Sequence, residues 1–288
     1  MSKTKAEITA GILPDSIHHS AEKEAFQRLN VGLSRILKGL ILPLIILAVW
    51  QAAGSLGIIS ENLLPVPTSI FQAFKELAST GELWNNLQIS SIRAGAGFIL
   101  GAGLGLLLGG VVGFSNKSEE LMDPSFQMLR TIPHLAVAPL FILWFGFGEL
   151  SKILLIAKGA FFPVYVNTFL GIRGVDSKLF DVARVLEFNK RKLFTKLILP
   201  AAMPNILLGI RLSLGIAWLG LVVAEMMGSS EGIGYMIMDA RQFSNTEVVF
   251  AGIIIFAAAG KITDSLVRLL EAKLLKWRDH FKGEKGEI

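Results

Sequence analysis

Residues 94–116 of the chain read AGAGFILGAGLGLLLGGVVGFSN and contain no charged side chain. About 20 apolar residues in a helix are enough to cross the roughly 30 Å of hydrocarbon in a membrane. Backbone groups in lipid must be hydrogen-bonded inside the segment, which favours a helix over an open strand. The stretch therefore predicts a membrane-spanning helix, and we expect that helix to begin earlier, near Asn86.

Glycine recurs at every fourth position of this stretch, so one face of the helix is a ridge without side chains. Such a ridge lets another helix backbone approach closely, which favours packing in lipid. Two interpretations stay open: packing against another helix of the same chain, and a contact between subunits or at a gate. The ridge consists of Gly97, Gly101, Gly105, Gly109 and Gly113.

The composition of the whole chain fits a membrane protein. Hydrophobic residues make up 52% and charged residues only 18%, whereas soluble domains hold about 25% charged residues. The absence of cysteine excludes disulfides and cysteine-bound metals, and only four histidines are present. The chain has no Gly-x-x-x-x-Gly-Lys-Ser/Thr, His-Glu-x-x-His or Gly-x-Ser-x-Gly sequence, so we predict neither a metal site, an ATPase nor another enzyme.

The apolar segments predict an all-α integral membrane protein with six membrane-spanning helices. We expect one membrane domain between a polar N-terminal segment without a signal peptide and a polar C-terminal tail. Asp123-Pro124 is the predicted start of the third helix, and Pro133-His134 is a candidate break within it. The expected spans are 39–60, 94–116, 131–148, 153–172, 204–228 and 248–270, and the expected divisions are 1–37, 38–270 and 271–288.

Basic side chains are distributed unevenly among the connecting segments. The N-terminal segment, the loop between the fourth and fifth spans and the C-terminal tail are all rich in lysine and arginine. The segments 61–85 and 229–246 have one basic residue each, Lys75 and Arg241. With six spans the three basic segments share one side, which the positive-inside rule places in the cytoplasm. We therefore expect an inner-membrane protein with both termini in the cytoplasm, and a net charge that indicates no nucleic-acid partner.

The loop 173–200 has a helical pattern of its own. Asp176 is placed to cap a first helix, and a polar turn at Asn189 leads to a second helix that we expect to end before Pro200. The sequence thus predicts a helix–turn–helix element on the cytoplasmic side. Its apolar side needs a partner, which is either the membrane surface or a groove in another protein.

This loop contains Asp181-Val182-Ala183, then Glu187, then Leu197-Ile198-Leu199-Pro200. Their order and spacing resemble the EAA loop of permease subunits of binding-protein-dependent ABC importers. In that pattern Glu-Ala-Ala is followed by a glycine and then by Ile-x-Leu-Pro. Asp181 and Val182 depart mildly, whereas Glu187 stands where the family has the glycine that turns the chain. We expect Asn189 to supply a left-handed residue instead.

The resemblance implies a role for the loop. In such importers it sits in a groove of a cytoplasmic ATPase, whose closure drives two permease subunits between inward-open and outward-open states. It also implies a permease homodimer, two ATPase subunits that hold ATP and Mg, an extracytoplasmic solute-binding protein, and no cofactor on this chain. The implied coupling residues are Asp181, Val182, Ala183, Leu186, Glu187, Leu193, Leu199 and Pro200.

Further motifs within about residues 40–280 resemble the sulfonate, taurine and nitrate branch of this family, and most closely its aliphatic sulfonate permeases. The resemblance implies import of an aliphatic sulfonate. Nitrate, taurine, bicarbonate and other small organic solutes stay open, because the branch shares much of this pattern. The motifs include Leu64-Pro65-Val66-Pro67-Thr68, Met128-Leu129-Arg130-Thr131-Ile132-Pro133-His134 and Gly232-Ile233-Gly234-Tyr235.

A few charged side chains fall inside the apolar segments, where an isolated charge costs about 2.5 kcal/mol or more. Lys158 and Arg211 are candidate contacts for an anionic solute. Snorkelling, or a pair between Lys158 and Glu225, is the structural alternative, and Lys261 and Asp264 are expected to pair locally. The candidate pathway residues are His134, Lys158, Asn167, Arg211, Trp218 and Glu225.

Two other classes of protein compete with the importer interpretation. A secondary transporter would need coupling carboxylates in the membrane and usually has inverted repeats, but such carboxylates are few and no repeat is visible. A membrane enzyme would need a cluster of nucleophile, base or metal ligands, which the sequence does not contain. We therefore expect a non-catalytic transport subunit.

Overall fold

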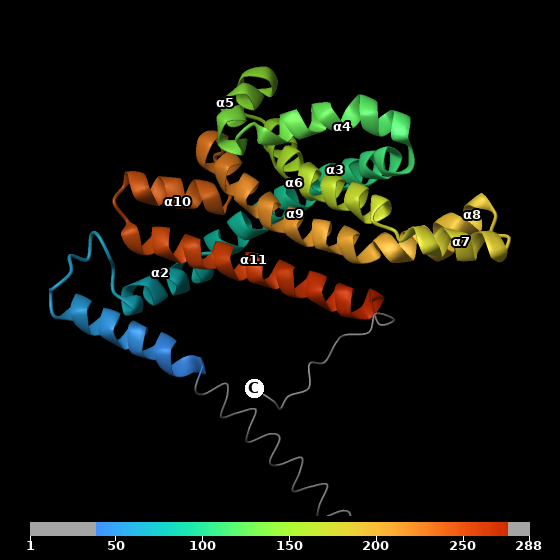
Figure 1. The fold of residues 1–288 in the computed structure, drawn as a ribbon. Helices are drawn as coiled ribbons and strands as arrows, with labels where there is room; N and C mark the ends of the chain where they lie inside the picture. The colour runs from blue at the N-terminus through green and yellow to red at the C-terminus, as the bar shows by residue number, and fades with distance from the viewer. Residues whose placement is uncertain (1–38, 276–288) are drawn as a thin grey trace, which may run out of the picture. The chain divides into compact units, whose positions relative to one another are not determined.

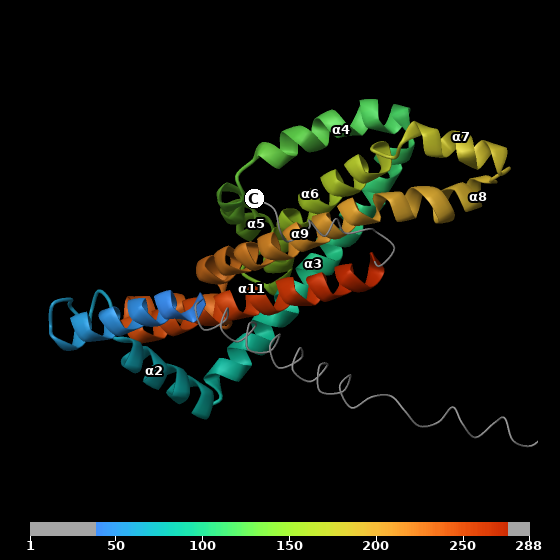
Figure 2. The same cartoon turned by 60° about the horizontal axis from the view of Figure 1, so that its bottom comes forward.

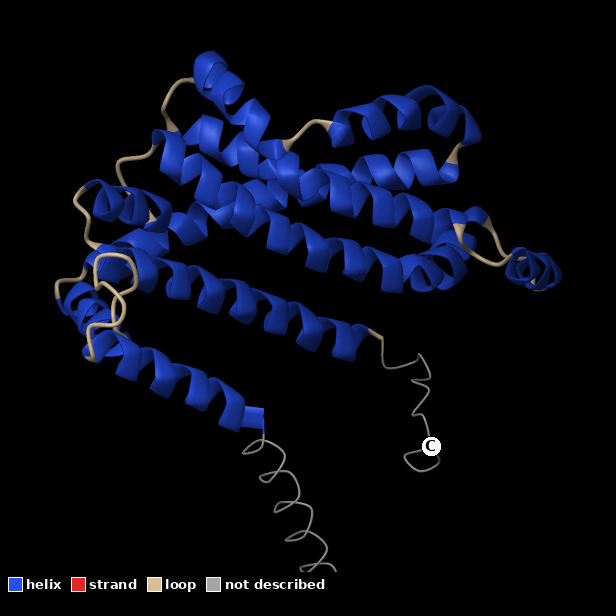
Figure 3. Ribbon diagram, turned by 60° about the vertical axis from the view of Figure 1, so that its left-hand side comes forward, coloured by secondary structure: helices blue, strands red, loops and turns tan. Residues whose placement is uncertain are grey.

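The computed structural model of the protein describes residues 39–275, in which the regular structure is helical throughout (Figures 1 and 3). The predictions for 1–38 and for 276–288 lie outside the described residues. The described chain separates into two compact units, of which one ends at Thr68 and the other begins at Ser69.

The first unit contains the apolar helix Gly39–Ser55 and the loop that leads into helix α2 (Pro67–Ser79). The side chain of Gln51 pairs twice with Thr68. Its Oε1 accepts the Thr68 N–H at 3.2 Å, and its Nε2 donates to Thr68 Oγ1 at 3.2 Å. Gln51 thereby satisfies one of the free N–H groups in the first turn of α2.

The second unit continues through the remaining helices. Its long helices α3, α6, α9 and α11 are joined by shorter helical segments (Figure 1). The bounds are α3 (Glu82–Phe114), α4 (Asn116–Thr131), α5 (His134–Phe145), α6 (Glu149–Arg173), α7 (Ser177–Val185), α8 (Lys190–Leu193), a π-helical turn (Phe194–Ile198), α9 (Leu199–Gly228), α10 (Ile233–Gln242) and α11 (Thr246–Leu274).

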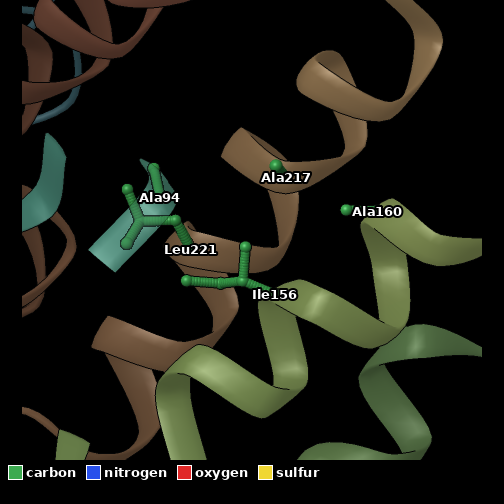
Figure 4. Close-up of a cluster of buried hydrophobic side chains, with 5 residues drawn as sticks. All are labelled: Ala94, Ile156, Ala160, Ala217 and Leu221. Atoms are coloured by element: carbon green, nitrogen blue, oxygen red, sulfur yellow. The ribbon is translucent and has the colours of Figure 1, made fainter. Parts of the chain in front are cut away.

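Helix α6 is central to this unit, because it packs against both α3 and α9. The three helices meet in a core of small and branched side chains, which Figure 4 shows at close range. Small residues at such crossings let helices approach closely in an apolar environment. The core consists of Ala94 from α3, Ile156 and Ala160 from α6, and Ala217 and Leu221 from α9.

The glycine ridge of α3 faces α6 along its whole length. At Gly101 a Cβ atom would overlap the carbonyl oxygen of Ala157, so the two backbones touch where only glycine fits. Gly95, Gly103 and Gly110, on the other faces of α3, have open space where a Cβ would lie. The ridge thus packs against another helix of the same chain, which is one of its two predicted roles.

Four helices among the described residues are long and apolar enough to span a membrane: α3, α6, α11 and the continuous stretch Lys190–Gly228. Helices α4 and α5 would add a fifth span if they are counted together, but they meet at an angle of 98°. The predicted third span, 131–148, is therefore not one straight helix. The break falls at Ile132-Pro133, where a candidate break is predicted, because the residue before a proline disfavours the helical conformation.

The predicted start of the third helix at Asp123-Pro124 is wrong. Helix α4 begins at Asn116, where Ser115 Oγ accepts the N–H of Ser118 at 3.2 Å. That serine cap follows α3 directly and starts the helix eight residues before the predicted position. Pro124 lies inside α4, and Asp123 Oδ1 accepts a hydrogen bond from the Tyr165 hydroxyl at 2.7 Å.

The predicted end of the second loop helix before Pro200 is also wrong. Helix α8, the π-helical turn and α9 follow one another without a gap. Pro200 lies in the first turn of α9, where a missing N–H is tolerated. The change of hydrogen-bond register in the π turn accommodates the proline in a continuous helical path.

Candidate functional site

The segment between α6 and α9 projects past the ends of α3, α6 and α11 (Figures 1 and 2). Two side-chain caps shape it. Asp176 Oδ1 accepts the N–H of Lys178 at 2.9 Å, as predicted. Asn189 Oδ1 accepts the N–H of Lys192 at 2.8 Å, a cap that the sequence analysis did not predict. The left-handed residue is Glu187, with φ 51°, and not Asn189. A capping residue needs an extended backbone, and Asn189 has one. The left-handed turn therefore falls on Glu187. This is the position at which the EAA loop pattern has glycine.

Helix α7 presents an apolar face to the surroundings. Val185 is 83% exposed, and Leu179, Val182 and Leu186 are also exposed. We call these four residues the α7 patch. Ala183, an implied coupling residue, is instead buried, so it shapes the element from inside, whereas Val182 and Leu186 are at its surface.

The remaining implied coupling residues lie at the tip and at the base of the segment. Asp181 is exposed and accepts a hydrogen bond from Arg184 Nη1 at 3.3 Å. Leu193, Leu199 and Pro200 are half-buried where the segment joins α9.

The base of this segment is fastened to the corner between α3 and α4. Arg173 Nη1 donates to Asn116 Oδ1 at 2.6 Å, and the same guanidinium forms an ion pair with Glu119. The ring of Phe194 in the π turn lies 5.4 Å from that of Phe114 at the end of α3. A displacement of the segment must therefore move the α3–α4 corner or break these contacts.

A cavity of about 440 Å³ lies where the break between α4 and α5 faces α6 and α9. Lys158, half-buried in α6, donates from Nζ to the carbonyl oxygen of Ile132 at 2.9 Å. That carbonyl belongs to the break, where a regular helical partner is missing. Arg130, in the last turn of α4, is exposed at the cavity wall and forms no hydrogen bond or ion pair with any residue in 39–275.

The ring of His134 fills a slot between α6 and α9. A Cβ at Gly159 would lie 3.0 Å from His134 Cε1, and one at Gly220 would lie 2.8 Å from Nε2. Nε2 is buried and has no hydrogen-bond partner among the described residues. The two glycines thus leave room for the first side chain after the break.

The rest of the cavity wall is mostly apolar. Asn167 also lines it, but its Nδ2 donates to the carbonyl oxygen of Pro163 at 2.8 Å in its own helix. No aspartate or glutamate is present among the described residues that line the cavity. The apolar lining includes Phe162 and Val166 from α6 and Leu212 and Ile216 from α9.

The alternative pair between Lys158 and Glu225 is wrong, because Glu225 lies in a separate network. It is 1% exposed, and its Oε1 accepts hydrogen bonds from Arg93 Nη1 at 2.9 Å and Ser90 Oγ at 2.8 Å. Arg93 also donates to both oxygens of Glu149 at 2.6 and 2.7 Å. Lys152 completes the network by donating to Glu149 at 3.0 Å. Arg93, Lys152 and Glu225 are buried, whereas the Glu149 side chain is 56% exposed. We call Arg93, Glu149, Lys152 and Glu225 together the buried charge network.

The buried charge network holds the connection between α9 and α10. Glu225 Oε2 accepts the N–H of Gly234 at 2.9 Å, and Ser90 Oγ accepts that of Ile233 at 2.9 Å. Gly232 has φ 109°, and a Cβ there would overlap the Glu225 carboxylate, so glycine is required. Arg93 is not among the residues that the sequence analysis predicts for the site. The signal was present, because a membrane helix that begins near Asn86 includes Arg93 as a charged residue within the span.

Arg211 lies in α9 and pairs with Asp264 in α11. Its Nε donates to Asp264 Oδ1 at 2.6 Å, and Asp264 Oδ2 accepts from Arg268 Nε at 2.9 Å. The expected pair between Lys261 and Asp264 is therefore wrong, because an arginine from the neighbouring helix takes the carboxylate.

The structure brings together three of the six candidate pathway residues. The ring of Trp218 packs against Phe256, with centroids 6.1 Å apart, beside the core of α3, α6 and α9. Like Arg211 and Glu225, it is not among the residues that line the cavity. The candidates that do line it are His134, Lys158 and Asn167.

Comparison with known proteins gives consistent matches. Residues 101–276 match the family described as binding-protein-dependent transport system inner membrane component. The Bacillus subtilis protein named as the aliphatic sulfonates transport permease SsuC is 69% identical over 247 residues, which cover 86% of this chain and 90% of the relative. The Escherichia coli K12 protein of the same name is 48% identical over 236 residues, covering 82% and 90%.

A more distant relative is the taurine transport system permease protein TauC of Escherichia coli K12. It is 32% identical over 238 residues, which cover 81% of this chain and 86% of the relative. The family match extends over more than half of the chain, and the relatives are covered over most of their length. The chain therefore belongs to the family of inner membrane components of binding-protein-dependent transport systems.

Proposed function

We propose that this chain is the membrane-spanning permease subunit of an ATP-driven importer of aliphatic sulfonates. It forms the translocation pathway and catalyses no reaction itself. The observation that carries the proposal is the 69% identity to the Bacillus subtilis protein named as an aliphatic sulfonates permease, against 32% to the taurine permease. Import of taurine, nitrate, bicarbonate or another small organic solute is the alternative within the same architecture.

The proposed topology has six spans with both termini in the cytoplasm. Helix Gly39–Ser55 is the first span and the bent pair α4–α5 is the third, alongside α3, α6, α9 and α11. The basic side chains of the α6–α9 segment support this orientation, because positive charge is enriched on the cytoplasmic side.

The α7 patch is the proposed docking surface for the partner ATPase, which holds ATP and Mg while this chain binds no cofactor. Exposed apolar side chains on a projecting helix support a partner that offers an apolar groove. The contacts between Arg173 and the α3–α4 corner would carry the movement of the ATPase into the membrane helices. Val182 and Leu186 would contact the ATPase directly, beside Asp181.

The complete importer is proposed to contain two copies of this chain, two ATPase subunits and a solute-binding protein. The binding protein would dock at the opposite end of the helices, near 61–85 and 229–246. The family description, which ties its members to a binding protein, supports this composition.

Reconstitution into liposomes tests the proposal. The chain is combined with its ATPase and binding protein, and uptake of hexanesulfonate is measured with and without ATP. We expect uptake only with ATP. Uptake that proceeds without ATP would instead indicate a secondary transporter, and ATP-driven uptake of taurine but not hexanesulfonate would overturn the substrate assignment.

A single substitution tests the docking surface. Leu186→Asp places a charge in the proposed apolar contact, and we expect about tenfold less ATPase to co-purify, since interface residues that matter cost more than 1 kcal/mol when altered. Leu63→Asp, at another exposed leucine, is the matched control and should leave co-purification unchanged. Equal co-purification of both variants would refute docking at the α7 patch.

A further inference from the structure

We propose that the cavity at the α4–α5 break binds the sulfonate during its passage and selects for an alkyl chain. Arg130 and Lys158 hold the anionic head, and the apolar walls of α6 and α9 hold the tail. This inference rests on the proposed function and adds the position and the selectivity of the site. It assigns a shared role to Arg130, which lies beside the break, and Lys158, which faces the break from α6.

The two cations that line the cavity have side-chain donors that no residue in 39–275 accepts. A sulfonate is a permanent anion with three acceptor oxygens, and charge-assisted hydrogen bonds to such oxygens are the strong ones. Lys158 uses one of its three ammonium donors on the Ile132 carbonyl. The side chain of Arg130 donates to no residue in 39–275. Arg130 and Lys158 both line the cavity and can both donate hydrogen bonds to the oxygens of one bound anion.

The break itself adds to the positive potential of the site. Helix α5 begins at His134, and Pro133 and His134 both line the cavity. The start of a helix carries the positive end of its dipole. In transporters, discontinuous helices commonly direct such ends at the anionic group of a substrate.

The tail end of the cavity offers apolar surface along α6. The lining residues of α6 run from Lys158 to Asn167, which corresponds to about 14 Å along a helix axis. Phe162 and Val166 lie one and two turns beyond Lys158 on that wall, and Leu212 and Ile216 also line the cavity, from α9. A volume of about 440 Å³ falls within the range of roughly 300–1,000 Å³ that is typical of small-molecule sites.

The charges of the cavity discriminate among the solutes that this branch of permeases imports. Taurine carries an ammonium group as well as a sulfonate, and no carboxylate is present among the described lining residues to receive it. An unpaired buried charge is costly. Nitrate and bicarbonate have no alkyl chain, so the apolar wall adds nothing to their binding. The cavity therefore favours an aliphatic sulfonate.

Binding to the full-length chain in lipid nanodiscs, without binding protein or ATPase, tests the inference by calorimetry. We expect affinity to rise by about fourfold for each CH₂ added from ethanesulfonate to hexanesulfonate, as for burial of a methylene. Taurine, which has the length of ethanesulfonate, should bind at least tenfold more weakly than ethanesulfonate. Lys158→Gln and Arg130→Gln should each weaken hexanesulfonate binding about tenfold.

Two variants serve as controls for this experiment. Lys158→Arg keeps the cation and should retain binding within about threefold, and Lys261→Gln removes a lysine that does not line the cavity and should bind as the unaltered chain does. Equal affinity of Lys158→Gln and the unaltered chain, or no dependence on chain length, would overturn the inference. If ATP-driven uptake persists in that case, the proposed function stands while the assigned site falls.

Discussion

The buried charge network and the cavity both place charged side chains among apolar helices, but they balance those charges differently. In the network, Arg93 and Lys152 face Glu149 and Glu225, so two positive groups meet two negative ones. In the cavity, Arg130 and Lys158 face no carboxylate from the described lining residues. The network balances its charges within the chain, whereas the described lining of the cavity offers no negative group to its two cations, which suits the proposed anion. The comparison separates structural charges from functional ones.

The largest expected effect comes from breaking the network. Arg93→Leu leaves Glu225 without its cation, and removal of one partner of a buried pair costs about 3–5 kcal/mol. The free energy of unfolding, measured by SDS titration of the reconstituted chain, should fall by that amount. Arg241→Leu, at an exposed arginine of α10, should change it by less than about 0.5 kcal/mol. Equal stability of the two variants would show that the buried charge network is not structural and would contradict its distinction from the cavity.

A smaller loss is expected where α3 is held against α6, the contact on which the network depends. Gly101→Val pushes a side chain into the Ala157 carbonyl, and overpacking of this kind costs about 1–3 kcal/mol. Gly103→Val has the same helix propensity but open space around it. The same SDS titration should separate the two variants, and identical values would show that the ridge does not fix the distance between the helices.

A smaller effect on stability is expected at the turn residue Glu187, which lies outside both the buried charge network and the cavity. A left-handed conformation costs a residue with a side chain about 1–2 kcal/mol, and glycine avoids that cost. Glu187→Gly should therefore raise the free energy of unfolding by up to about 1 kcal/mol, once the greater freedom of unfolded glycine is subtracted. Glu61→Gly, at a turn residue without positive φ, should not stabilise. A loss of stability in Glu187→Gly would contradict the assigned backbone conformation.

The sharpest contrast with Arg93 is expected at Lys158. Lys158→Leu breaks no ion pair and removes one hydrogen bond, to the Ile132 carbonyl, so the free energy of unfolding should fall by no more than about 1.5 kcal/mol. Hexanesulfonate uptake per assembled transporter should nevertheless fall about tenfold or more. A stability loss as large as that of Arg93→Leu would mean that Lys158 has a structural role, as the residues of the buried charge network do.

Local signals in the sequence predicted part of this structure correctly. The cap at Asp176 and the break at Pro133 depend on neighbouring residues only, so the sequence predicts them. The left-handed residue expected at Asn189 lies instead at Glu187, because Asn189 caps the next helix. The start at Asp123-Pro124 failed because two cap signals compete there, and Ser115 comes first.

The partners of the buried charges could not be predicted in the same way. Arg93 binds carboxylates 56 and 132 residues away, and sequence alone does not give the rotation of each helix about its axis. The same missing rotation led to the wrong pairs for Lys158 and Asp264. The cavity was partly anticipated, through His134, Lys158 and Asn167, because polar residues in an apolar span are conspicuous. Arg130 was missed because it lies at the end of a polar helix.

ATP-driven uptake of hexanesulfonate into proteoliposomes, compared between the unaltered chain and Lys158→Gln at equal amounts of assembled transporter, tests the central claim most directly. We expect at least a tenfold lower uptake for Lys158→Gln, with restoration by Lys158→Arg. Uptake by Lys158→Gln equal to that of the unaltered chain would contradict it.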